Sequence, residues 1–273
     1  MPLSINTNIA SMTAQRSFLQ SNSALETSFE RLSTGKRVNS ASDDAAGLAI
    51  GTDLQSRVNG LNQAVRNVND GISMIQITEG TYDEVTTILQ RMRDLAVQGA
   101  SESLSSTETD YLDSEHTKLV SALDTVMNQA YFGNTDLSKE TDVTKVIHAG
   151  ADASDTISIT LSVSTADDAD SLGVDTDDIT IGDAAAITTI DSALDKVASH
   201  RALLGAQQAQ LESTVRNLAN VAENTAAAAG RIMDTDYAAE TANLTKAQIL
   251  QQAATSILAQ ANAQPQAVLS LLQ

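Results

Sequence analysis

Clustered acidic side chains and three histidines are the groups in this sequence that could bind a metal ion or act as acid and base. The segment Asp175–Asp178 begins like a calcium-binding loop, because carboxylates stand two positions apart. Such a loop needs glycine at its sixth position and glutamate at its twelfth, where this sequence has Thr180 and Ala186. We therefore do not expect calcium to bind here.

The histidines, His116, His148 and His200, fall in three separate segments. None belongs to the H-E-x-x-H motif that binds zinc from one helix face, and we expect each to be exposed or beside a helix end. The sequence also lacks a phosphate-binding P-loop, the G-x-S-x-G elbow of hydrolases and a dinucleotide-binding glycine fingerprint. Since there is no cysteine nucleophile either, we predict that the protein is not an enzyme and has no catalytic residue, cofactor or metal site.

Two hydroxyl and two carboxylate side chains, Ser40, Ser42, Asp43 and Asp44, directly precede a long apolar pattern. Their oxygens can accept the unpaired N–H groups at the start of a helix, and the negative charges favour the helix dipole. The alternative is a paired-carboxylate acid–base or metal site, but no histidine or third carboxylate follows within one helical turn. We interpret this group as the cap of a long helix.

The composition limits both the core and the partners. Aromatic residues make up only 3% of the 273 residues and tryptophan is absent, so the core must consist mainly of Ala, Leu, Ile and Val. The prolines, Pro2 and Pro265, leave the chain between them free to form uninterrupted helices. A net charge of −19 argues against nucleic acid or anionic lipid as a partner. No stretch has the roughly 18 apolar residues that membrane insertion as a helix requires.

Apolar residues over 54–75 recur in alternating steps of four and three, the pattern of a coiled-coil seam. The same register continues to Ala96 and predicts one helix over 44–99, about 80 Å long at 1.5 Å per residue. A second pattern, over 112–130, predicts a returning antiparallel helix that ends near Gly133. A third helix should carry the residues Leu204, Leu211, Val215, Leu218, Ala222 and Thr225. Three such helices suffice for a bundle.

A small β region is expected between the second and third helices. Over 157–163, Ile, Ile, Leu and Val alternate with Ser and Thr, which is the period of a half-buried strand. The segments 146–149 and 179–181 are the strands that we expect to pair with it.

The two ends of the chain carry sparser helical patterns, which we expect to pair with each other. Those patterns consist of Phe18, Leu25, Phe29, Leu32, Leu244, Ala247, Leu250, Ala254, Ile257 and Ala261. Since neither end buries much apolar surface, both should be loose in a monomer. The predicted fold class is mainly α: a long antiparallel helical bundle or coiled coil with a small β-hairpin region, plus paired N- and C-terminal helices. The expected domains are a terminal coiled coil, 1–43 with 232–273, and a bundle, 44–231, with a β or variable segment at about 142–190.

Segments at both ends and in the middle resemble bacterial flagellin: SASDDAAGLAI near the start, GADASDTISITL in the middle and AQANAQPQAVLSLL at the close. The resemblance extends over nearly the whole chain and implies a short form that lacks the large variable outer domains. It implies a structural subunit that is exported unfolded and polymerises through its terminal helices into the flagellar filament, for swimming motility. The absence of a cleavable signal peptide would by itself indicate a cytoplasmic protein. The resemblance instead implies a secreted, extracellular protein of the bacterial flagellum filament.

The resemblance also implies particular contact residues and partners. A surface of the bundle is similar to the one through which flagellins touch neighbouring subunits and the flagellin-sensing Toll-like receptor of innate immune recognition: Gln90, Arg91, Leu95, Gln98 and Glu115. Packing in the inner tube of the filament would fall on residues near the C-terminus: Leu250, Ile257, Leu269, Leu271 and Leu272. Besides copies of the chain itself, the implied partners are a flagellar export chaperone, the filament cap and hook-junction proteins.

Two alternatives remain open at this point. A hook-filament junction protein has similar termini and belongs to the same machinery. A soluble coiled-coil adaptor belongs to another class, and it would keep ordered ends as a monomer and would not polymerise.

Overall fold

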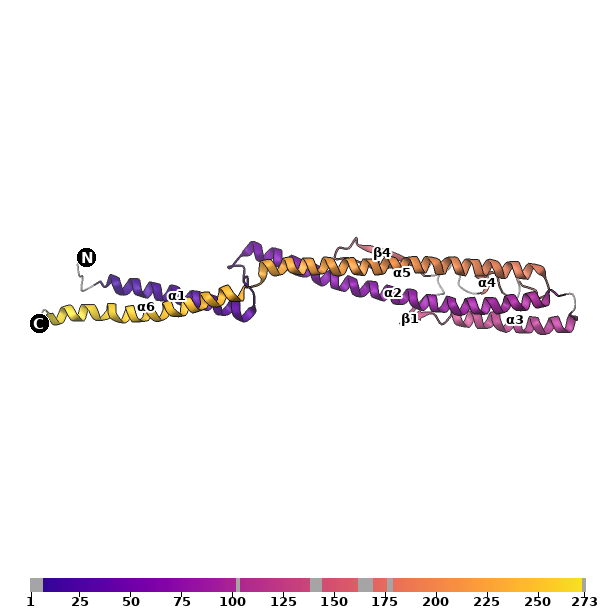
Figure 1. The fold of residues 1–273 in the computed structure, drawn as a ribbon, viewed down its shortest axis with the longest axis horizontal. Coiled ribbons are helices and arrows are strands. Elements are labelled where there is room, and N and C mark those ends of the chain that lie inside the picture. The colour runs from indigo at the N-terminus through magenta and orange to yellow at the C-terminus, as the bar shows by residue number, and fades with distance from the viewer. Residues whose placement is uncertain (1–6, 102–103, 138–143, 162–168, 176–178, 272–273) are drawn as a thin grey trace. The chain divides into compact units, whose positions relative to one another are not determined.

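The structure, a computed structural model, describes residues 7–101, 104–137, 144–161, 169–175 and 179–271. The helices within these residues are α1 (Ile9–Thr34), α2 (Ala45–Gly99), α3 (Ser106–Met127), α4 (Ala169–Leu172), α5 (Ala184–Met233) and α6 (Tyr237–Leu271). The strands form two antiparallel hairpins, β1 (Tyr131–Phe132) with β2 (Thr135–Asp136) and β3 (Thr144–His148) with β4 (Thr156–Thr160) (Figure 1). This is the mainly α fold with a small β region that the sequence predicts. The chain forms two compact units, residues 57–223 and residues 1–56 with 224–273.

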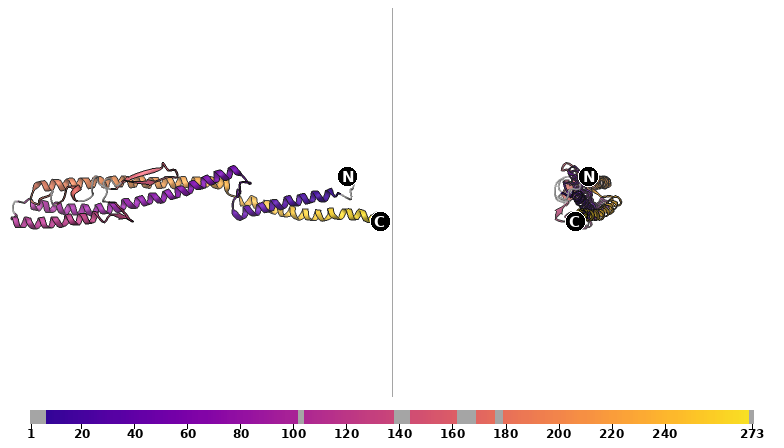
Figure 2. Two further views of the ribbon diagram at one scale, coloured as in Figure 1. Left: turned by 180° about the vertical axis from the view of Figure 1, so that it is seen from behind. Right: turned by 90° about the vertical axis from the view of Figure 1, so that its left-hand side faces the viewer.

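In the unit of residues 57–223, α2, α3 and α5 surround one apolar core and lie side by side in both views (Figures 1 and 2). The bounds of α2 confirm the long helix predicted over 44–99. Its buried face advances in steps of three and four, as a coiled-coil seam does, through Leu61, Ala64, Val68, Gly71, Ile75, Thr78, Tyr82, Val85 and Leu89. Val65 and Ile72, two residues of the predicted seam, are only partly buried because Ala64 and Gly71 occupy the inner positions.

Helix α3 confirms the returning helix but ends earlier than predicted. It begins where the carboxylate of Glu108 accepts hydrogen bonds from the backbone N–H of Ser105 at 2.8 Å and from its hydroxyl at 2.7 Å, a capping box. It ends at Met127, and the β1–β2 hairpin follows. Gly133, near which the helix was expected to end, has a φ of +61° and lies in the hairpin turn, where L side chains are strained.

The β3–β4 hairpin confirms the pairing of the two alternating segments. Ile147 stands opposite Ile157, and Ile159 and Leu161 are buried in the bundle core. The hairpin approaches α2 closely at Gly71, where a Cβ atom would overlap the Cδ1 of Ile147. Val163, at the end of the predicted strand, lies outside the described residues.

The third predicted strand, 179–181, was wrong. Ile179 and Ile181 are buried in an irregular segment before α5, and no strand pairs with them in the part of the chain that the structure describes. Gly182, with a φ of +113°, forms the turn that leads the chain into α5. The two isoleucines before it are buried in the core without being part of a strand.

Two of the three histidines correct the expectation that they are exposed or beside helix ends. His116 is fully buried on the face of α3 that also carries Leu112 and Val120, and His200 is 7% exposed in α5. The cause is spacing, since each histidine follows a core residue of its own helix by three or four positions. His148, in β3, is exposed as predicted.

The capping group before α2 is confirmed in part. The Asp44 carboxylate accepts the backbone N–H of Gly47 at 2.9 Å and so caps α2. Asp43 instead accepts the N–H groups of Ser40 and Asn39 at 2.9 and 3.1 Å. These bonds stabilise the charged form and hold the pKa of the Asp43 carboxyl below its ordinary value. Asp43 therefore closes the turn ahead of the helix rather than the helix itself.

Candidate assembly surface

Helices α1 and α6 pair antiparallel in the unit of residues 1–56 with 224–273 (Figures 1 and 2). We call the residues that face each other across this pair the terminal seam. On α1 they are Ala14, Phe18, Ser21, Leu25, Ser28 and Leu32. On α6 they are Glu240, Leu244, Ala247, Gln251, Ala254, Leu258 and Ala261. Both series advance strictly in steps of four and three, which is the geometry of a coiled coil.

Small and polar side chains occupy the most buried positions of the terminal seam. Ala14, Ser28, Ala247, Ala254 and Ala261 are each 5 to 6% exposed. Because these side chains bury little apolar area, the pair gains little hydrophobic stabilisation from its own contacts.

Polar contacts cross the terminal seam at several levels. The side-chain amide of Asn8 donates to the carbonyl oxygen of Ala261 at 2.8 Å, near one end of the pair. Midway along it, the Gln251 amide donates to the Asn22 amide oxygen at 3.1 Å.

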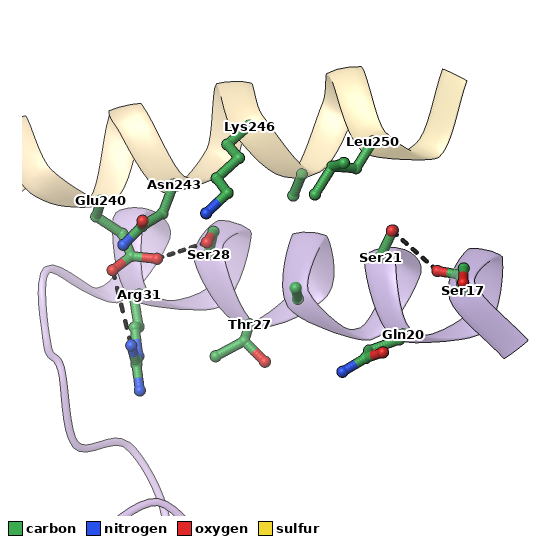
Figure 3. A pocket seen from close by; sticks show the side chains of 12 residues that line it. Ser17, Gln20, Ser21, Thr27, Ser28, Arg31, Glu240, Asn243, Lys246 and Leu250 are labelled. Carbon is green, nitrogen blue, oxygen red and sulfur yellow. Dashed lines mark hydrogen bonds and ion pairs between the residues drawn. The ribbon is translucent and has the colours of Figure 1, made fainter. Parts of the chain in front are cut away.

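Near the other end of the pair, Glu240 of α6 is held by α1. The Ser28 hydroxyl donates to its carboxylate at 2.5 Å, and the Arg31 guanidinium lies 3.7 Å from its second oxygen (Figure 3). These residues line part of a groove of about 650 Å³ between the two helices.

The large apolar side chains of the terminal pair lie mostly on its outside. Those that are about half exposed or more are Ile9, Met12, Leu19, Phe29, Ile249, Leu250 and Ile257. Leu250 and Ile257, predicted as packing residues, are 48% and 56% exposed, so within one chain they do not pack into the terminal seam. Several large apolar side chains exposed on one helical pair favour an interaction surface. Leu269 and Leu271 fall in the last turns of α6, and Leu272 lies outside the described residues.

Of the bundle surface predicted from the resemblance, the structure brings two residues into contact. Arg91 of α2 donates from its Nε to Glu115 of α3 at 3.0 Å, and both side chains are about half exposed. Gln90 and Gln98 are exposed as well. Leu95 is fully buried, because it falls on the face of α2 that forms the core. This corrects its assignment as a contact residue, since its side chain offers no surface to a partner.

Sequence reasoning missed the charged contacts between α2 and α5, and the buried position of Glu240. Arg93 pairs with Asp191 at 2.6 Å and Arg201 pairs with Asp83 at 3.1 Å. The signal for Glu240 was present in the heptad spacing, since it stands seven residues before Ala247. Among the described residues, no three His, Asp or Glu side chains gather as metal ligands, and no described helix is long and apolar enough to cross a membrane.

Paired terminal helices with exposed apolar side chains, together with a helical bundle, define a helical protein of the structural-subunit class. Two family models match the sequence: the bacterial flagellin N-terminal helical region over residues 5–141 and the bacterial flagellin C-terminal helical region over residues 187–272. The chain therefore belongs to the bacterial flagellin family, and it is a structural subunit of the flagellar filament.

Relatives of two lengths match along the whole chain. A flagellin of Halalkalibacterium halodurans is 41% identical over 98% of this chain and 99% of its own length. Flagellin A of Vibrio anguillarum is 34% identical, and the alignment covers 100% of both chains but runs over 379 positions. The 273 residues here thus confirm the predicted short form.

Two solved structures are also similar. The crystal structure of Bacillus cereus flagellin is 30% identical, with a TM-score of 0.46, over 60% of this chain and 94% of that one. A flagellar hook-associated protein of Vibrio parahaemolyticus has a TM-score of 0.57 at 14% identity, over 70% of this chain and 100% of that one. At that identity the hook-associated protein shows the fold alone, whereas the flagellins of Halalkalibacterium halodurans and Vibrio anguillarum match 98% and 100% of this chain in sequence.

Proposed function

We propose that the chain polymerises with copies of itself through the α1–α6 pair. The observation that carries this proposal is the distribution of side chains in the pair: small residues fill the most buried positions of the terminal seam, while large apolar residues such as Leu250 and Ile257 are about half exposed. Burying a Leu or Ile side chain contributes about 1.5–3 kcal/mol, so neighbouring copies that cover Leu250 and Ile257 supply the stability that the terminal seam lacks. We extend this packing role to Leu269, Leu271 and Leu272.

Each of the two expected domains has its own place in the proposed filament. Residues 1–43 with 232–273 form the terminal coiled coil that lines the inner tube, and residues 44–231 form the bundle of the outer shell, with a variable segment at about 142–190. The helix ends support these limits, since α1 ends at Thr34, α2 begins at Ala45, and the break between α5 and α6 follows Met233. Between these elements, the backbone of Thr235 donates to Gly35 at 3.0 Å.

The role in the filament is mechanical and requires no catalysis. Identical subunits joined by head-to-tail contacts that do not close into a ring give an open helical fibre, which converts motor rotation into thrust for swimming. The chain is secreted and extracellular. A weakly packed terminal pair is compatible with export in an unfolded state, because ordering of the two helices is offset only when copies pack together. The export chaperone, filament cap and hook-junction proteins are the further partners.

The bundle surface around Arg91 has a second role in this scheme. Gln90, Arg91, Gln98 and Glu115 are exposed in the free chain. We propose that they contact a neighbouring subunit in the filament and, in released subunits, the flagellin-sensing Toll-like receptor. The exposed ion pair between Arg91 and Glu115 favours this reading, because it presents charged groups of both signs at one point of the surface.

Seeded growth tests the assembly role. Sheared filament seeds are added to the intact chain and to a chain truncated from Leu244 to Gln273, and growth is followed by light scattering and negative-stain microscopy. We expect uniform filaments from the intact chain alone, while the truncated chain keeps a folded bundle by circular dichroism. Filaments from the truncated chain would refute the scheme. An intact chain that stays monomeric with ordered ends would favour the junction protein or the adaptor.

Binding to the immobilised receptor ectodomain tests the second role. Combined replacement of Arg91 and Glu115 by alanine should weaken binding of the monomer at least tenfold. Arg66→Ala, at an exposed arginine elsewhere on α2, is the matched control. Equal binding by both variants would remove the receptor role while leaving the assembly role intact.

A further inference from the structure

The apolar pattern of the terminal seam repeats almost unchanged every seven residues. On α1 the small positions are Ala14, Ser21 and Ser28, and the large ones are Phe18, Leu25 and Leu32. On α6 the small positions Ala247, Ala254 and Ala261 are likewise seven apart, and Leu244 and Leu258 are two of the large ones. A slip of one heptad would again place small against small and large against large, so apolar packing alone does not choose one register.

Two polar residues of α6 break this repeat. Glu240 occupies the first small position of the α6 series and Gln251 occupies its middle large position. Glu240 is only 7% exposed, and its carboxylate is satisfied by Ser28 and lies near Arg31 (Figure 3). Gln251 is satisfied by Asn22, which flanks the seam on α1. Each polar residue thus has its partner only in the observed alignment of the helices.

We propose that Glu240, assisted by Gln251, fixes the register in which the two terminal helices pair. A slip of one heptad toward the start of α1 would place Glu240 against Ser21 and would replace Arg31 by Ala24. The carboxylate would then be buried without a cation, which is strongly unfavourable. In the opposite slip, Glu240 passes the end of α1 at Thr34. Specifying a register is the best-attested use of a buried polar group in paired helices.

The same slips leave Gln251 without its partner. Moving by one heptad brings Gln15 or Phe29 to the place of Asn22. Phe29 offers no hydrogen bond, so the half-buried amide of Gln251 would lose one without replacement. Gln15 can still form a hydrogen bond with the Gln251 amide. We therefore assign most of the discrimination between the observed and the slipped registers to Glu240.

Register selection matters for assembly, and this step rests on the proposed function. The exposed residues Leu250 and Ile257 of α6 and Leu19 of α1 keep fixed positions along the pair relative to one another only while the helices keep their alignment. A slip by one heptad shifts these groups by about 10 Å along the pair. A slipped subunit could not present the same surface to its neighbours. The polar contacts of Glu240 and Gln251 thus allow a weakly packed pair of helices to enter the polymer in one register only.

Cysteine cross-linking can report the register, because the chain has no cysteine of its own. The native-register probe combines Ser11→Cys with Asn262→Cys, whose side chains are hydrogen-bonded at 2.7 Å. The slip probe combines Ser11→Cys with Thr255→Cys, one heptad earlier on α6. Both probes are placed in the unsubstituted full-length chain, in the Glu240→Leu variant and in the control Glu30→Leu, which alters an exposed glutamate of α1.

In the unsubstituted and Glu30→Leu chains, only the native-register probe should form an intramolecular disulfide. In Glu240→Leu, the slip probe should cross-link to at least a third of the extent of the native probe, and seeded growth should slow at least tenfold. Cross-linking is read in the free chain and in the polymer, so the register is scored even where filaments do not grow. Unchanged cross-linking in Glu240→Leu would overturn the register proposal. Failure of the unsubstituted chain to polymerise would instead overturn the proposed function.

Discussion

The imidazole of His200 packs edge-on against the ring of Tyr82, with ring centroids 5.2 Å apart and an angle of 73° between the planes. The contact joins α5 to α2 inside the bundle core, and the Nε2 of His200 lies 3.1 Å from the carbonyl oxygen of Leu161, just after β4. His116 is the second buried histidine, and within the described residues neither of its ring nitrogens has a hydrogen-bond partner. The bundle therefore buries two imidazoles that could each take up a proton.

The stability of the bundle should fall as the pH drops below about 6.5. Burial lowers the pKa of both His116 and His200 below 6.5, although Asp113 and Asp175 oppose the shift at His116 and the Leu161 carbonyl opposes it at His200. Below 6.5 the unfolded chain binds more protons than the folded chain, so the free energy of unfolding decreases. The slope of the free energy of unfolding is at most about 1.4 kcal/mol per pH unit for each histidine. The contribution of the two histidines to stability is fully present above the unfolded-state pKa of about 6.5 and is lost progressively below it.

Guanidinium denaturation between pH 8 and pH 5 measures this slope. His116→Leu should reduce it, because a leucine cannot take up a proton and leaves no unpaired buried nitrogen. His148→Gln, which replaces a histidine at an exposed position of β3, is the matched control. An unfolding free energy that is flat across this range in the parent chain would contradict the prediction.

Replacing Leu95 by alanine should destabilise the bundle far more than replacing Arg91 by alanine, although the two residues are close in sequence. Leu95→Ala removes a fully buried side chain from the core and should destabilise the bundle by about 2–5 kcal/mol. Arg91→Ala breaks an ion pair whose side chains are about half exposed, and it should cost less than about 1 kcal/mol. Chemical denaturation of both variants makes the comparison. Similar losses of unfolding free energy in the two variants would contradict the assignment of Leu95 to the core and of Arg91 to the surface.

The sequence predicted the helices well because a coiled-coil pattern is a strong periodic signal. Step lengths of three and four identified α2, the capping residues ahead of it located its start to within one residue, and strict alternation located β4. Steps alone do not say which face of an alanine-rich helix meets its partner. On α6 the predicted pattern includes Leu250 and Ile257 as well as Ala247 and Ala254, and spacing alone does not say which of the two sets meets α1. The structure places the alanines inside.

Buried polar residues were the other source of error, because residue type was given more weight than position. His116 stands four residues after Leu112 and four before Val120, both of which are core residues. Glu240 likewise occupies a seam position, where a charge is uncommon unless it has a partner. Its partners, Ser28 and Arg31, lie more than 200 positions away in the sequence, so no local pattern could have indicated them.

Gly71 and Ile147 should be energetically coupled, because a Cβ at Gly71 would overlap the Cδ1 of Ile147. Gly71→Ala alone gains about 1 kcal/mol of helix propensity but displaces the isoleucine that docks β3 on α2. Ile147→Val removes the overlapping methyl group, so in that background the alanine should be more favourable by on the order of 1 kcal/mol. A double-mutant cycle from denaturation curves measures the coupling. Additive effects would show that Ile147 can move aside at no cost.

Serine at both Leu250 and Ile257 should strongly impair filament growth without changing the bundle. These side chains are outside the terminal seam in a single chain, so their loss removes apolar burial between copies, about 1.5–3 kcal/mol for each side chain. Since about 1.4 kcal/mol corresponds to a tenfold change in an equilibrium constant, the critical concentration for seeded growth should rise at least tenfold. Gln248→Ser with Gln252→Ser is the matched control, because it places two serines at exposed polar positions of the same helix. If the control and the apolar variant grow equally well, the outward face of α6 is not the assembly surface, and the filament contacts must be sought on the bundle instead.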